Sequence, residues 1–79
     1  MKLKQGDFIR IDWIDAGGAG GWTSHHKYEP PRIVTIGHYI KEDRQGIYTA
    51  PSIDRNDFEY VLGLDFIPKG CIKRVRRLK

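Results

Sequence analysis

The sequence predicts a small all-β domain with five strands, a long first loop and at most one single-turn helix. Short runs of β-branched and aromatic residues are bounded by Gly, Pro, Asp and Asn, a pattern typical of strands and turns. Apolar and polar residues alternate in the first of these runs. No segment sustains helical periodicity over the roughly ten residues that a helix needs. Five short strands hide their edges by closing, in part or in full, into a small barrel.

The first two strands are predicted over residues 6–15 and 32–40, on either side of the long loop. In the first strand, one face holds Ile9, Ile11 and Trp13. In the second strand, one face holds Val34, Ile36 and Ile40 with His38 among them, and the other holds Ile33, Thr35 and Tyr39. The polar segment 41–46 ends in glycine and is predicted to connect this strand to the next.

Three further strands are expected over residues 47–51, 59–67 and 71–78, with a polar loop at 52–58 and a tight turn at 68–70. The third strand is stopped by a proline. One face of the fourth strand holds Tyr60, Leu62, Leu64 and Phe66. In the last segment, apolar residues recur at every third position, namely Ile72, Val75 and Leu78, which suits neither a regular strand nor a helix. Its length and the preceding turn favour a strand.

Length and composition indicate one domain over residues 1–79. The hydrophobic fraction is 39% and the charged fraction 30%, which is ordinary for a folded domain. A chain this short has a small core, so self-association is one way to gain stability. No apolar run reaches the length of a membrane span or a signal peptide, and the single Cys71 cannot form an internal disulfide. We therefore expect a cytoplasmic protein that does not contact membranes.

Two stretches resemble the SH3-like small barrels. "KQGDFIRIDWID" is similar to their opening strand, where Gly-Asp leads into an alternating strand followed by a long loop. "DFIPKGCIKRV" is similar to their ending, where a short turn containing proline connects the last two strands. The resemblance implies the fold but not the function, since such barrels bind peptides, nucleic acids and modified side chains. In size and layout the chain also resembles the small accessory proteins of bacteriophages.

Basic residues gather at the two ends of the chain. Residues 1–4 and 69–79 hold eight of the fourteen Lys and Arg, whereas all ten acidic residues lie between them with the other six basic ones. The ends therefore carry about +8 and the body about −4, which sum to the net +4. A basic C-terminal strand can attract phosphate groups, although a charged terminal strand also serves to discourage aggregation between sheet edges.

The stretch "DAGGAGGWTSHHKYEPPR", residues 15–32, offers several kinds of site. A phosphate cradle needs a following helix and a Lys-Ser or Lys-Thr pair, and both are missing here. A metal site built on His25 and His26 would also need Asp15, Glu29 or His38. Ser24 next to a histidine does not make a catalytic dyad, because neighbours in sequence do not acquire the required geometry. Cys71 is interpreted as a structural thiol rather than a nucleophile.

A recognition loop is the remaining interpretation. Loops of this length in small domains are uncommon unless they are functional or disordered. The glycines allow close approach to another surface, and Trp22 and Tyr28 offer flat apolar faces. The alternative is that Trp22 folds back to cap the barrel.

We therefore expect a non-enzymatic module, without metal or cofactor, that binds a nucleotide or single-stranded nucleic acid. The predicted ligand-binding residues are Trp22, His25, His26, Tyr28, Lys73, Arg74, Arg76 and Arg77. Further stacking aromatics are Tyr39, Tyr48 and Tyr60. The alternative is a protein–protein interaction module, such as a phage-type inhibitor of a host protein, that uses its aromatic loop and an exposed edge strand. No carboxylate pair, triad or metal-ligand spacing points to an enzyme.

Overall fold

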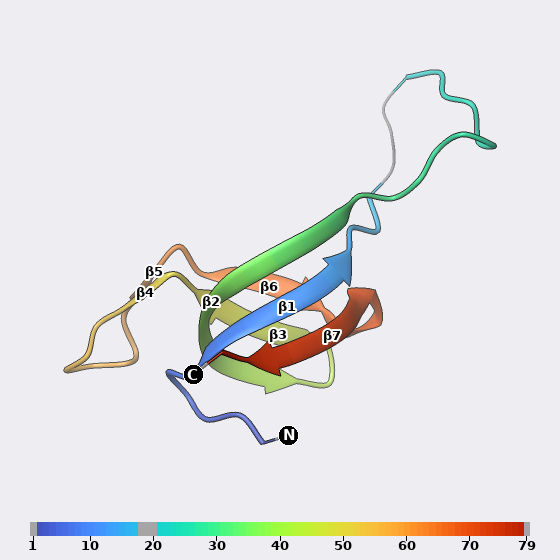
Figure 1. The fold of residues 1–79 in the computed structure, drawn as a ribbon. Helices are drawn as coiled ribbons and strands as arrows, with labels where there is room; N and C mark the ends of the chain where they lie inside the picture. The colour runs from blue at the N-terminus through green and yellow to red at the C-terminus, as the bar shows by residue number, and fades with distance from the viewer. Residues whose placement is uncertain (1, 18–20, 79) are drawn as a thin grey trace.

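The computed structural model describes residues 2–17 and 21–78, which form an all-β fold (Figure 1). Five strands make one antiparallel sheet in the order β6-β3-β2-β1-β7. These strands are β1 (Phe8–Ile14), β2 (Arg32–Asp43), β3 (Gly46–Ala50), β6 (Asp65–Pro68) and β7 (Ile72–Arg77). A two-stranded sheet pairs β4 (Ser52–Ile53) with β5 (Val61–Leu62), and one 3-10 turn, η1 (Lys69–Cys71), precedes β7. Over the described residues, no helix is long and apolar enough to cross a membrane.

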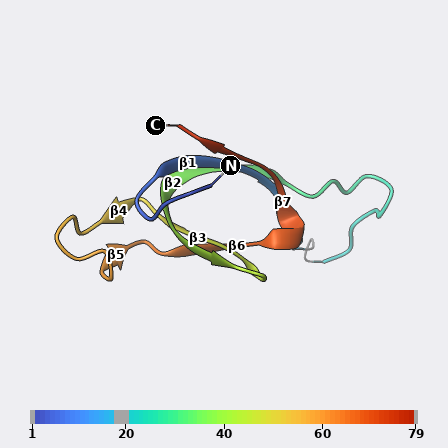
Figure 2. The same cartoon turned by 90° about the horizontal axis from the view of Figure 1, so that it is seen from below.

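The five-stranded sheet bends around its core. Figure 2 shows β1 and β2 lying opposite β3 and β6, so that the inner faces of these strands meet. The buried hydrophobic cluster consists of Ile9, Ile11, Tyr39, Ile47 and Ile67, with Leu3, Trp13, Ile72 and Val75 packed against it. The all-β class and the inward face of the first strand are therefore confirmed. The edges of the sheet are β6 and β7, which are joined through η1 and are not hydrogen-bonded neighbours.

The second strand is longer than predicted. It runs to Asp43, so the expected connection at 41–46 shortens to the two residues Arg44 and Gln45. Asp43 holds this turn, since its Oδ1 accepts hydrogen bonds from the backbone N–H groups of Gln45 and Gly46 at 2.7 and 3.2 Å. A bulge at Ile40 shifts the register against β3 between Tyr39 and Lys41. The polar end of β2 is thus paired with β3, although its residue types are typical of a loop.

The predicted fourth strand is divided in two, and its expected apolar face is exposed. Gly63 lies between β5 and β6 with a φ of 75°, a conformation that L-residues with side chains rarely adopt. A side chain at this position would also approach the Pro51 ring to 3.1 Å. The chain therefore bends at Pro51 and Gly63, and the hairpin beyond the bend continues as the β4–β5 arm, residues 52–64. The predicted loop at 52–58 was thus wrong at its first two residues.

The last segment is a strand, and a bulge explains its period of three. Ile11 pairs with Val75, but Trp13 pairs with Ile72, so one extra residue of β7 is accommodated opposite the step from Asp12 to Trp13. Two apolar residues three positions apart consequently reach the same core. Cys71 lies in η1 rather than in the strand and is half-buried.

The Tyr39 side chain lies in the core beside Glu42. Its hydroxyl donates a hydrogen bond to Glu42 Oε1 at 3.0 Å, and its side chain is 8% exposed. Burial first, and then the hydrogen bond and the negative charge of Glu42, raise the pKa of Tyr39 above its ordinary value of 10.0. It is therefore a core residue rather than a stacking surface, which removes it from the candidate aromatics.

Candidate functional site

Three of the predicted basic residues form an exposed basic strip on β7, namely Lys73, Arg74 and Arg76. In the register with β1, Arg74 lies opposite Asp12 and Arg76 lies opposite Arg10. Arg10 neutralises Asp12, because its Nη2 is 3.0 Å from the Asp12 Oδ1. Within residues 2–17 and 21–78, none of the three strip residues makes an ion pair. The strip therefore presents positive charge to solvent along a sheet edge.

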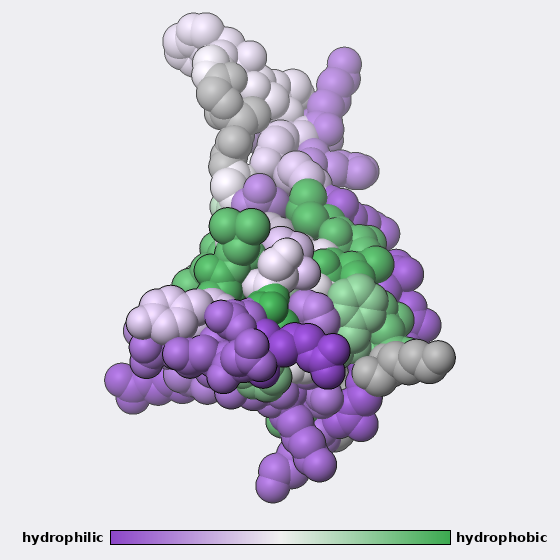
Figure 3. All heavy atoms as spheres, turned by 90° about the vertical axis from the view of Figure 1, so that its left-hand side faces the viewer, coloured by the Kyte–Doolittle hydropathy of each residue, from purple (hydrophilic) through white to green (hydrophobic). Residues whose placement is uncertain are grey.

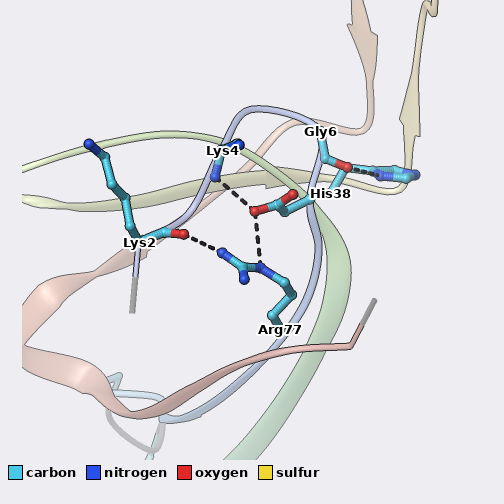
Figure 4. Close-up of polar contacts among 6 residues, drawn as sticks. Lys2, Lys4, Gly6, His38 and Arg77 are labelled. Carbon is cyan, nitrogen blue, oxygen red and sulfur yellow. Dashed lines mark hydrogen bonds and ion pairs between the residues drawn. The ribbon is translucent and has the colours of Figure 1, made fainter.

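Arg77 lies at the end of the same strand but serves a different purpose. Its Nε donates to the Asp7 carboxylate at 3.2 Å, and its Nη2 donates to the Lys2 carbonyl oxygen (Figure 4). The same Asp7 oxygen accepts a hydrogen bond from the Lys4 backbone N–H at 2.8 Å. Beside it, His38 Nδ1 lies 3.0 Å from the Gly6 carbonyl oxygen. Arg77 thus fastens the N-terminal segment to β7, and we call these contacts the terminal latch.

The long loop carries the predicted aromatic residues away from the sheet (Figure 1). Trp22 is fully exposed, so it does not fold back over the core of the sheet. Tyr28 is held more firmly: its hydroxyl donates to the Gly17 carbonyl oxygen at 2.9 Å, and its backbone N–H bonds to the Ser24 carbonyl oxygen at 3.2 Å. The middle of the glycine run, residues 18–20, lies outside the described residues.

The two histidines lie side by side in this loop. The ring centroids of His25 and His26 are 3.9 Å apart with the planes tilted by 40°. The other candidate metal ligands do not join them: among the residues described, no group of three or more His, Cys, Asp or Glu side chains is placed to hold a metal ion.

The structure brings only one end of the basic strip toward the loop. A hollow of about 460 Å³ lies where the loop leaves the sheet. Its lining residues are Asp12, Trp13, Ile14, Arg32, Ile33, Val34 and Lys73. Arg74, Arg76 and the loop residues Trp22, His25 and His26 do not line it. Lys73 is therefore the link between the two predicted halves of the site.

The sequence interpretation missed this hollow. Trp13 is predicted on the same face of β1 as Ile9 and Ile11 and does pack against the core, but nothing predicts that it also lines a hollow, and Arg32 is predicted only as the start of a strand. The position of Trp13 and Arg32 in the sequence could have indicated that they lie close together. They flank the long loop, and the two strands of a hairpin meet at the base of the loop that joins them. The remaining partner, Lys73, reaches the hollow from β7, which only the sheet order reveals.

Comparison with known proteins gives no relative on which to base a function. No protein-family model matches the chain, no curated protein matches it, and no solved structure matches its fold.

Proposed function

We propose that this protein is a cytoplasmic, non-enzymatic binding module that recognises an anionic partner, either a nucleotide or single-stranded nucleic acid. The observation that carries the proposal is the basic strip, in which Arg74 and Arg76 are exposed and free of ion pairs with the described residues while Arg10 and Arg77 are paired. Exposed cations at a sheet edge bind phosphate, releasing counterions as they do so.

The aromatic loop supplies the second part of this mode of binding. Proteins that bind single strands combine a positively charged path with aromatic side chains on which bases stack. Trp22 is fully exposed, and Tyr28 is fixed by its hydrogen bond to the Gly17 carbonyl oxygen. In the proposed complex, phosphates lie on β7 and the loop, with His25 and His26 at its surface, folds onto the bases.

A test uses a fluorescently labelled single-stranded oligonucleotide and measures its anisotropy at increasing salt. Wild-type affinity should fall steeply with ionic strength, and Arg74→Gln and Arg76→Gln should each weaken binding and lower the salt slope by about 0.7. Arg55→Gln, on the β4–β5 arm, is the matched control. Affinity that is independent of salt, or equal losses in the control, would contradict phosphate recognition by the strip.

A protein–protein interaction is the second candidate, and one surface favours it. Four large hydrophobic side chains along residues 60–66, which include β5 and the start of β6, are exposed, namely Tyr60 at 63%, Leu62 at 72%, Leu64 at 57% and Phe66 at 36%. Figure 3, which views the molecule from the side of the arm, shows hydrophobic patches among hydrophilic side chains. Clustered exposed hydrophobic residues are typical of interaction sites. A phage-type inhibitor would use such a surface, and its binding would depend little on salt.

We also propose that the domain is an SH3-like small barrel. Support comes from three features: a single antiparallel sheet of five strands, a long connection between its first two strands, and a turn with Pro68 and η1 before the last strand. For such a barrel we expect slow hydrogen exchange at the backbone amides of all five strands and fast exchange in the β4–β5 arm.

A further inference from the structure

The hollow at the base of the long loop has the dimensions of a ligand site. Its volume of about 460 Å³ falls within the range of roughly 300–1,000 Å³ typical of small-molecule pockets. Three strands contribute to it: β1 and β2 from both sides of the loop, and β7 through Lys73. Residues far apart in the sequence therefore converge on one concave surface.

The apolar part of the hollow is held in place by the sheet. The indole N–H of Trp13 donates to the Thr35 hydroxyl at 2.9 Å, so the polar edge of the ring is satisfied and its orientation is fixed. Ile14, Ile33 and Val34 complete the apolar lining, and the last of these is 51% exposed. A planar apolar ring could thus be accommodated here without leaving the indole nitrogen unpaired.

The polar part of the hollow favours an anion. Arg32 and Lys73 are both exposed and make no ion pair with any described residue. Among the described residues that line the hollow, Asp12 alone carries a carboxylate, and Arg10 neutralises it at 3.0 Å. The hollow therefore combines two uncompensated positive charges with an apolar wall.

We propose that this hollow binds a nucleoside phosphate, with the base against its apolar wall and the phosphate at the cations Arg32 and Lys73. This inference rests on the proposed function. It says which part of the anionic partner, a nucleoside phosphate, lies at the Lys73 end of the basic strip. The basic strip favours a nucleic acid as the ligand of the hollow over a peptide that ends in a hydrophobic residue and a carboxylate. From Lys73, the exposed cations Arg74 and Arg76 continue along the same strand, so further phosphates of a bound chain would meet further cations.

The experiment compares AMP, a 5′-phosphorylated pentanucleotide and its unphosphorylated counterpart, with wild-type protein and with Arg32→Gln, Lys73→Gln and Arg55→Gln variants. Isothermal titration measures binding to each. We expect wild type to bind the phosphorylated strand more tightly than the unphosphorylated one, and Arg32→Gln or Lys73→Gln to reduce that affinity roughly tenfold and remove the preference. Arg55→Gln, which lies outside the hollow and the strip, should behave as wild type.

The two ligands separate a free nucleotide from a strand end. If AMP binds as tightly as the phosphorylated strand and is equally sensitive to Arg32→Gln, the ligand is a free nucleotide; if only the strand binds, it is the end of a chain. Both results support the hollow.

The two proposals fail in different ways. Oligonucleotide binding that depends on Arg74 and Arg76 but not on Arg32 or Lys73 would overturn the hollow and leave the proposed function intact. No binding of AMP or of either strand would overturn both. Binding of a peptide with a hydrophobic C-terminus in place of all three nucleotide probes, lost in Arg32→Gln, would overturn the nucleotide assignment.

Discussion

Arg76 and Arg77 are neighbours in sequence, yet the structure predicts opposite consequences when each is replaced by Gln. The Arg77 side chain is 41% exposed and joins Asp7 and the Lys2 carbonyl oxygen, so it stabilises the fold by closing the terminal latch. Arg76 is exposed, makes no ion pair with the residues that the structure describes, and lies opposite Arg10, another cation. Replacing Arg76 should therefore affect binding, whereas replacing Arg77 should affect stability.

The size of the stability effect follows from the contacts of Arg77. An exposed ion pair contributes about 0.2–1 kcal/mol, and a hydrogen bond to a charged group adds a similar amount, reduced here because the guanidinium is partly solvated. We expect Arg77→Gln to lower the free energy of unfolding by about 1 kcal/mol, or the Tm by about 4–8 °C for a domain of this size. Arg76→Gln should change stability by less than about 0.5 kcal/mol.

The assay pairs urea unfolding with the oligonucleotide titration for both variants, and adds Asp7→Asn and the double variant Asp7→Asn/Arg77→Gln. Since Asp7 and Arg77 share one interaction, their destabilisations should not add. The reasoning is refuted if Arg77→Gln unfolds like wild type but loses as much affinity as Arg76→Gln. That result would return Arg77 to the ligand-binding surface.

Three further predictions follow from single side chains. The raised pKa of Tyr39 means that its contribution to stability is fully present below about pH 10 and is lost as the pH rises through the folded-state pKa, so Tyr39→Phe should flatten the alkaline fall in urea midpoint. Gly46→Ala should unfold the protein or lower its stability by several kcal/mol in thermal melts, because the new Cβ would clash with the Ile67 carbonyl oxygen and lie 2.8 Å from the Phe66 ring. Trp22→Ala should leave the melting curve unchanged, since the side chain is fully exposed, but weaken oligonucleotide binding by about 1–3 kcal/mol; unchanged affinity would exclude stacking by this residue.

The strands that alternate clearly were predictable from sequence, whereas their irregularities were not. β1 shows its inward face directly, because Ile9 and Ile11 alternate with charged residues and both are completely buried. The bulges at Ile40 and Lys73 each add a residue that only the neighbouring strand reveals. The break of the fourth strand depends on the contact of Gly63 with Pro51, twelve positions earlier in the chain. Such long-range contacts leave no local pattern in the sequence.

Part of the candidate site could also be predicted from the sequence, and part could not. The exposed cations of β7 could be read from their density near the C-terminus, since a run of charged residues is solvated. The different role of Arg77 could not, because its carboxylate partner is seventy positions away in sequence. The hollow likewise requires β7 to lie beside β1, which no pairing of consecutive strands would predict.

The distribution of charge over the fold should limit how much of the proposed nucleic-acid partner the protein contacts. The loop and the β4–β5 arm extend to different sides of the sheet (Figure 1), and the arm region carries the carboxylates of Asp54, Asp57 and Glu59 against the single positive charge of Arg55. The six residues of β7 span about 20 Å, enough for only a few phosphates. Beyond Arg77, a longer strand approaches Asp7 and the acidic arm, whose carboxylates repel it. Affinity should therefore rise with oligonucleotide length over the first few nucleotides and then level off, and a continued rise in anisotropy titrations would show that phosphates bind beyond the strip.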